Sequence, residues 1–342
     1  MSGRVPWKAA STLIACALAI VLLYFSLRGI DWHRVWKLTM GARSGYLAIA
    51  GAIMTVGLFL RAARWRILLR AEYPVTIQDA FWATCAGYFG NSFLPARAGE
   101  LIRTYMIHRS SGLSTAFVLT TALSERAADA FTLVGISTVA LFTLPAPPGW
   151  LAHASKPFGI LGVGGILGIV LAPRLAFVGD WLIDHLLPPS IREKLHSILS
   201  SVVLGIRASH NTRRLAGFGV MTIVIWSGDA AALMLTARSV HLTIPLPVAF
   251  LLLAGLGLAS ALPSTPGYVG IYQFVAVSIL VPFGMSRTDA IGYILLLQGL
   301  QYFVVGAWGA VALWKDRKKI SGSTPGSQRP MFQAAEDTRR CS

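Results

Sequence analysis

The chain has 342 residues, of which 55% are hydrophobic and 13% charged, and its 30 Lys and Arg against 14 Asp and Glu give a formal charge of +16. Soluble proteins carry about 25% charged residues, so this composition excludes an ordinary soluble enzyme, and its apolar content excludes a disordered chain. Binding to nucleic acid is not expected either, because the basic residues flank long apolar runs instead of alternating with polar ones. The composition predicts an all-α, polytopic membrane protein whose basic excess marks its cytoplasmic loops.

Six apolar runs approach the roughly 20 residues that a helix needs to cross a bilayer. They cover residues 9–27, 45–60, a stretch within 114–144, 158–172, 215–237 and 290–314. The first run is too long for the apolar core of a signal peptide and ends without a small-residue cleavage site, so we expect a retained helix. Behind the second run, Arg61, Arg64, Arg66 and Arg70 surround Trp65, which is typical of a helix end at the lipid headgroups.

The distribution of charge predicts the topology. Six spans place both termini on one side, and with that side cytoplasmic, 22 of the 30 basic residues lie in cytoplasmic segments against seven in outer loops. Residues 191–214 combine apolar positions at helical spacing with basic ones, which predicts an amphipathic helix on the inner leaflet. We therefore expect a cytoplasmic N-terminus at 1–8, one transmembrane domain at 9–314 and a basic, disordered cytoplasmic tail at 315–342, in the inner (plasma) membrane of a bacterium.

Two further apolar runs are interrupted by Pro and Gly and do not fit simple spans. Residues 77–94 lead into Asn91-Ser-Phe-Leu-Pro95-Ala-Arg97-Ala-Gly99-Glu100, and residues 248–283 are broken at Leu262-Pro263-Ser-Thr-Pro266-Gly267-Tyr-Val-Gly270. Non-helical backbone at membrane depth is tolerated only where protein or water satisfies it, so we interpret both as re-entrant helix pairs. The alternative for the second is two short spans joined by a turn. Because one pair enters from each side, the pattern suggests inverted repeats.

Three charged residues, Glu125, Arg126 and Asp129, lie within the third apolar run. A charge at the bilayer centre costs about 2.5–3.5 kcal/mol on insertion scales, so partners or water are needed. Arg126 and Asp129 are three residues apart on a helix and can pair directly. The three side chains then either lock helices together or line a path for a polar substrate.

Residues beside the first break are candidates for binding a headgroup. Arg97, Glu100 and Arg103 share one stripe if the segment is helical, and arginine suits bidentate recognition of phosphate, although Arg103 fits a cytoplasmic loop charge equally well. Asn91 is expected to cap the following turn or to touch a ligand.

Two polar residues occupy other apolar segments. Asp229 is a lone acid in the fifth span and is expected to pair with a basic residue of another helix or to act as a proton or ion relay. Gln273 follows the second break and is expected to form an interhelical hydrogen bond.

These motifs, in their order and spacing, resemble the lysylphosphatidylglycerol synthase/flippase transmembrane domain family over roughly residues 10 to 315. The pattern comprises Asn91-x3-Pro95-x3-Gly99-Glu100-x2-Arg103, Glu125-Arg126-x2-Asp129 and Pro263-x2-Pro266-Gly267-x2-Gly270, with the Arg64-Trp65-Arg66 run. In full-length relatives this domain moves aminoacylated phosphatidylglycerol between leaflets, and a separate synthase domain makes that lipid. We expect no synthase domain and no synthase activity here. Relatives often have Glu in place of Gln273. The candidate substrate-binding residues are Asn91, Pro95, Arg97, Gly99, Glu100, Arg103, Glu125, Arg126, Asp129, Pro263, Pro266, Gly267, Gly270 and Gln273.

The sequence therefore predicts a lipid flippase that moves a polar or anionic headgroup, such as that of an aminoacyl-phosphatidylglycerol, polyprenyl-linked or hopanoid lipid. The alternative is a non-transporting accessory protein that scaffolds a lipid or glycolipid synthase. No catalytic motif, metal-ligand cluster or cofactor fingerprint is present, so we expect no enzyme activity and no cofactor. The expected partners are membrane lipids and, in the alternative, that synthase.

Overall fold

The computed structural model confirms an all-α membrane fold. It describes residues 21–70, 73–94, 98–144, 149, 181, 185, 212–261 and 266–322, among which no β-strand occurs. Four helices within these ranges are long and apolar enough to cross a membrane: α3 (Ser44–Leu69), α6 (Thr115–Thr143), α10 (Thr212–Ser239) and α13 (Arg287–Gly322). The span predicted at 158–172, most of the first span, nearly all of the helix predicted at 191–214, and residues 323–342 of the tail lie outside the described residues; residues 21–27 are helical.

Two of the spans are longer than the sequence predicted. α3 continues nine residues beyond Leu60 to Leu69, and two of the arginines expected at the headgroups, Arg61 and Arg64, lie inside the molecule on this continuous helix. α13 continues beyond Trp314 to Gly322. A short amphipathic helix, α2 (Trp32–Met40), was not predicted; the Asp31 side chain caps it by accepting a hydrogen bond of 3.0 Å from the Arg34 backbone N–H.

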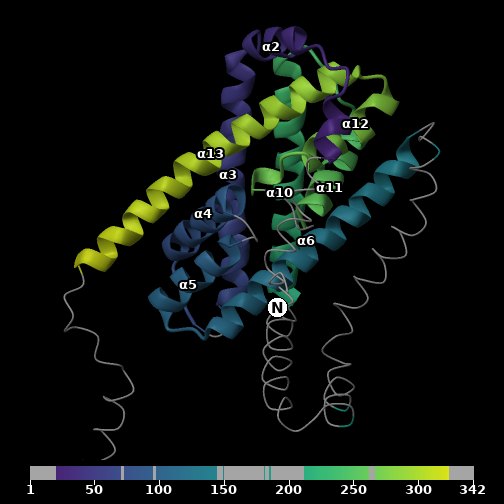
Figure 1. Ribbon diagram of the computed structural model, residues 1–342. Coiled ribbons are helices and arrows are strands. Elements are labelled where there is room, and N and C mark those ends of the chain that lie inside the picture. Colours follow the sequence, from purple (N-terminus) through teal and green to yellow (C-terminus); the bar gives the residue numbers. More distant parts are fainter. Residues whose placement is uncertain are drawn as a thin grey trace, which may run out of the picture.

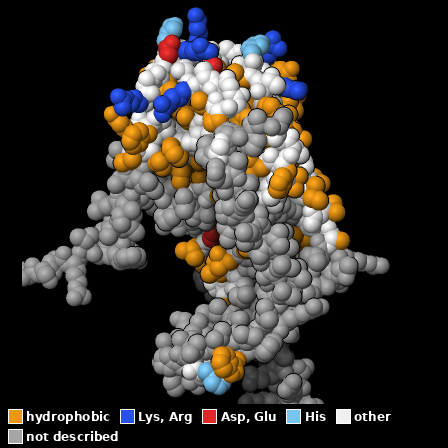
Figure 2. Space-filling model, turned by 90° about the vertical axis from the view of Figure 1, so that its right-hand side faces the viewer, with side chains coloured by type: hydrophobic (Ala, Val, Ile, Leu, Met, Phe, Trp, Pro, Cys, Tyr) orange, Lys and Arg blue, Asp and Glu red, His pale blue; other side chains and the backbone are white. Residues whose placement is uncertain are grey.

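α2 lies at one end of the molecule, together with the first turn of α13 (Figure 1). Arg34 of α2 forms a bidentate ion pair with Asp289 of α13, at 2.9 and 2.7 Å, and the hydrogen bond and charge of Asp289 raise the pKa of Arg34 above its ordinary value. Figure 2 shows Lys, Arg and His side chains gathered at this end, above hydrophobic side chains on the described part of the same face. Such a change from charged to apolar surface is what a bilayer interface requires.

Each interrupted run forms a helical hairpin inserted between two spans. α4 (Ile77–Phe93) and α5 (Gly99–Ser111) lie between α3 and α6 in the chain, and α11 (Leu246–Ala261) and α12 (Ile271–Leu280) lie between α10 and α13. Short 3-10 turns at Pro266–Tyr268 and Val281–Phe283 precede and follow α12. The order of span, hairpin and span therefore occurs twice, as in an inverted-repeat arrangement.

The two hairpin tips meet inside the molecule, with α4 and α5 toward one end and α11 and α12 toward the other (Figure 1). A Cβ built on Gly267 of the second tip would lie 3.4 Å from the Ser92 carbonyl oxygen of the first. Tyr302 of α13 connects both tips, because its hydroxyl donates to the Gly267 carbonyl oxygen and its ring lies 5.8 Å from that of Phe93. This contact favours re-entrant pairs over independent short spans.

Glycines allow α4 and α5 to cross at close range. A Cβ on Gly90 would lie 2.7 Å from the Gly99 Cα, and a Cβ on Gly99 would lie 2.7 Å from the Asn91 backbone nitrogen and overlap the Gly87 carbonyl oxygen. These neighbours are backbone atoms, so a rotamer change cannot relieve the overlap. The close crossing positions Asn91 and Glu100, which flank the break, beside each other.

We expect Gly99→Ala to lower the free energy of unfolding by about 3 kcal/mol or more, since its methyl group would separate α4 from α5. Thermal unfolding of the detergent-purified protein measures this effect. Gly135→Ala is the matched control, because Gly135 is on α6 and a methyl group added there would meet nothing within 4 Å. Equal stability of the two variants would contradict the close crossing.

Candidate functional site

A cavity of about 260 Å³ lies between the spans and the hairpins. We call it the central cavity. Leucine, valine and alanine supply half of the residues on its wall, with contributions from α3, α4, α6, α10, α11, α12 and α13. The polar and aromatic side chains on its wall are Arg61, Tyr88, Arg126, Asp129, Trp226, Asp229, Ser260, Tyr272 and Gln301. A pocket with apolar walls and a few converging polar groups is the usual form of a ligand site.

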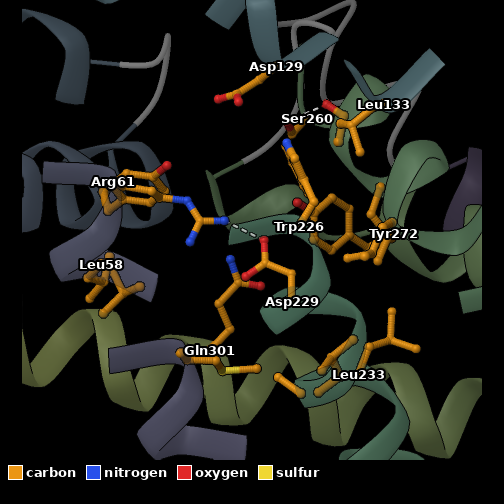
Figure 3. A pocket seen from close by; sticks show the side chains of 18 of the residues that line it. Leu58, Arg61, Asp129, Leu133, Trp226, Asp229, Leu233, Ser260, Tyr272 and Gln301 are labelled. Atoms are coloured by element: carbon orange, nitrogen blue, oxygen red, sulfur yellow. Dashed lines mark hydrogen bonds and ion pairs between the residues drawn. The ribbon is translucent and has the colours of Figure 1, made fainter. Parts of the chain in front are cut away.

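Arg61 and Asp229 form an ion pair on the wall of the central cavity. Arg61 reaches from α3 toward Asp229 on α10, and Gln301 of α13 projects toward the same space (Figure 3). The two charged side chains are 14% and 19% exposed. The Arg61 guanidinium also lies 5.8 Å from the ring centroid of Tyr88 and 5.9 Å from that of Trp226, within range of cation–π attraction.

A second set of charges lies beside the cavity and in part on its wall, and we call it the charge network. It comprises Arg64, Glu100, Arg103, Glu125, Arg126 and Asp129. Arg64 is 1% exposed and bonds Asp129 through both of its terminal nitrogens, at 2.7 and 2.9 Å. It also bonds Glu125 at 3.0 Å and the Thr222 hydroxyl at 3.0 Å, so one guanidinium joins α3, α6 and α10.

Arg103 extends the charge network to the first hairpin. It contacts Glu125 of α6 at 3.1 Å and Glu100 at 2.7 Å, and its guanidinium lies 4.5 Å from the ring centroid of Trp65. Arg126 bonds Glu100 at 2.9 Å and lies 5.1 Å from the ring centroid of Tyr88. Glu100 and Glu125 are therefore each shared between two arginines, which compensates their burial.

The structure decides two points about these charges that the sequence left open. Arg126 pairs with Glu100 and not with Asp129, because Asp129 is taken by Arg64 from another helix. Arg103 is buried within the network and does not line the central cavity, so it is neither a loop charge nor placed to meet a headgroup there. Arg126 and Asp129 do line the cavity, and Asp229 has the interhelical basic partner that was predicted.

The described residues at the two breaks occupy the hairpin tips and are not among the residues that line the cavity; they are Asn91, Gly99, Glu100, Gly267, Gly270 and Gln273. Asn91 donates to Glu100 at 3.3 Å instead of capping α5, whose N-cap is Ala98. Gln273 confirms the predicted interhelical hydrogen bond, since it donates to Gln298 of α13 at 2.8 Å and also accepts from the Gly270 N–H. Gln298 in turn donates to the Gly267 carbonyl oxygen at 2.6 Å. The side chains of Pro95, Arg97, Pro263 and Pro266 lie outside the described part of the structure.

Arg61 and Arg64 were not predicted as partners for the intramembrane acids. They were expected at a helix end because the apolar run stops at Leu60, whereas the helix continues to Leu69. Their spacing of three residues, which puts both on one face, was the available signal. Arg61, Arg64 and Arg103 are inside the molecule and carry no topological information, so the basic residues divide 19 to seven between the predicted sides.

Two comparisons with known proteins agree on the kind of domain. Residues 12–309 match the family model described as the lysylphosphatidylglycerol synthase TM region. The chain is also similar to a protein of Haloferax volcanii named glycosyltransferase AglD, with 27% identity over 310 residues that cover 80% of this chain. The match covers 48% of that relative, so the chain spans about half the length of the curated protein it resembles.

Proposed function

Since the chain belongs to the lysylphosphatidylglycerol synthase transmembrane region family, we propose that it moves a lipid with a polar or anionic headgroup between the leaflets of a membrane. The observation that carries this proposal is the central cavity, where Arg61, Arg126, Asp129 and Asp229 meet an otherwise apolar wall. A headgroup would contact these side chains while the acyl chains remain in the bilayer. Charged groups retained inside membrane spans commonly mark such pathways.

We also propose that the protein lies in the inner (plasma) membrane of a bacterium with both termini in the cytoplasm. The 19-to-seven division of the basic residues that remain outside the buried sites supports this orientation. In it, the hairpin of α4 and α5 enters from the cytoplasm and the hairpin of α11 and α12 enters from outside.

The direct test is leaflet exchange of fluorescent phospholipids in proteoliposomes, with aminoacylated, anionic and zwitterionic headgroups in the panel. We expect protein-dependent exchange of at least one lipid, and we expect Ala130→Phe to reduce its rate at least roughly tenfold by filling the cavity that Ala130 lines. Ala48→Phe is the matched control, because Ala48 is exposed on α3. No exchange of any lipid in the panel would refute the proposal.

The second candidate is an accessory role beside a lipid-glycosylating enzyme. The observation that favours it is the name of the Haloferax volcanii relative, a glycosyltransferase that matches this chain over 48% of its own length. In this case the charges hold the helices together, and the protein presents the lipid or the enzyme without moving either. The two candidates therefore predict different effects on leaflet exchange when a charge that lines the cavity is replaced.

A further inference from the structure

We infer that Arg61 binds the phosphate of an anionic headgroup. Asp229 pairs with Arg61 while the cavity is empty, and it takes up a proton when the phosphate displaces it from Arg61. This inference rests on the proposed function and deepens it in two respects. It names the recognised chemistry, a phosphodiester anion, and it couples binding of that anion to one proton.

The ion pair of Arg61 and Asp229 differs from the charge network in how firmly it is held. Arg64 makes four hydrogen bonds to three side chains and is 1% exposed, so exchanging one partner would disturb three helices. Arg61 and Asp229, by contrast, are joined by a single hydrogen-bonded contact between α3 and α10, and both are partly exposed to the central cavity. A ligand in the cavity can therefore replace the carboxylate without dismantling the network.

The surroundings of Arg61 are suited to an incoming anion. Trp226 lines the cavity next to Arg61, and its buried indole N–H has no hydrogen-bond acceptor among the described residues. A buried donor without an acceptor costs free energy, which a phosphate oxygen would recover. Arg126 lies over the same Tyr88 ring as Arg61 and also lines the cavity, so a second guanidinium faces the space where the phosphate would lie. Arginine matches phosphate oxygens through two parallel N–H bonds.

The uptake of a proton follows from the side chains that remain near Asp229 after the phosphate has displaced it from Arg61. The ionisable side chains that surround it or share the cavity wall with it are Arg61 and Arg64 of α3, Tyr88 of α4, Arg126 and Asp129 of α6, and Tyr272 of α12. Arg64 and Arg126 already hold other carboxylates. The displaced carboxylate would thus be an uncompensated charge in an apolar setting, and such groups become neutral by taking up a proton, here from the buffered solution.

Isothermal titration calorimetry of the purified full chain with dioctanoyl-phosphatidylglycerol tests this, when repeated in buffers of different ionisation enthalpy. The dependence of the heat on the buffer gives the protons taken up per lipid bound. We expect about one proton for the wild type, and none for Asp229→Asn, whose amide has no acidic site to neutralise. Arg61→Gln should weaken binding roughly 10- to 100-fold, as expected for loss of a charge-assisted hydrogen bond.

Asp316→Asn is the control, because it removes a carboxylate that pairs with Arg109 at 3.6 Å, away from the central cavity, and it should retain one proton. The measurement on the wild type needs no variant to fold. Binding of the lipid without proton uptake, or an unchanged proton count in Asp229→Asn, would overturn the inference and leave lipid transport standing. Absence of binding by the wild type would also overturn it, and the leaflet-exchange assay decides the proposed function separately.

Discussion

Replacing Arg64 with glutamine is expected to lower the free energy of unfolding by about 3–5 kcal/mol, the usual cost of removing one member of a buried ion pair. The substitution leaves Asp129 without a cation and leaves Glu125 with Arg103 alone. It also releases the contact with Thr222 that joins α3 to α10. Chemical denaturation in detergent, with the yield of monodisperse protein, measures the loss.

Arg66→Gln is the matched control on the same helix. Among the described residues, the Arg66 side chain makes one hydrogen bond, at 2.7 Å to the Val75 carbonyl oxygen, and its loss should cost no more than about 1.5 kcal/mol. The double variant Arg64→Gln/Asp129→Asn should recover part of the loss, because it removes the unpaired carboxylate as well. If Arg64→Gln proves as stable as Arg66→Gln, the charge network does not hold the helices together.

Arg126→Gln is expected to slow leaflet exchange roughly 10- to 100-fold while the protein remains folded. Arg126 is 25% exposed and lines the central cavity, and Glu100 keeps Arg103 as a partner after the substitution. Glu125→Gln is expected to affect folding instead of leaflet exchange. Glu125 is 4% exposed and lies outside the cavity wall, so its loss should lower the folded yield and leave exchange by the folded fraction largely unchanged.

This pair of variants separates the two candidate functions. A transporter needs the cavity-lining arginine for its exchange rate. In a non-transporting accessory protein, both residues serve only to hold the helices together. Exchange rates are compared per folded molecule, after the fraction of monodisperse protein has been determined for each variant. Transport is contradicted if Arg126→Gln lowers only the folded yield, with exchange per folded molecule unchanged.

The sequence predicted the helical class and the two hairpins because both depend on local signals. Apolar length identifies spans, and Pro and Gly at positions such as Gly267 and Gly270 mark where a helix must stop. Asp229 was identified as needing a partner for a similar reason, since an acid in an apolar span is costly wherever the helix packs. Such inferences require no knowledge of which helices touch.

The choice of partners could not be predicted, because it depends on helix packing. Arg126 and Asp129 have a spacing that permits a pair, yet Arg64 contacts Asp129 with both terminal nitrogens from a neighbouring helix. Arg64 itself was assigned to the headgroups, because hydropathy cannot distinguish a helix that ends from a helix whose basic residues face a buried acid. The separation of cavity-lining Arg126 from buried Arg103 likewise required the three-dimensional arrangement.

α13 makes contact with both hairpins, and this constrains the length of the segment between the contacts. Gln298 and Tyr302 bond the Gly267 carbonyl oxygen of one tip, while Gly306 and Gly309 lie against Phe93 and Phe89 of the other hairpin. One residue inserted between Tyr302 and Gly306 would rotate the second set of contacts by about 100° relative to the first. During evolution this stretch can therefore accept substitutions on its outer face far more readily than any insertion or deletion.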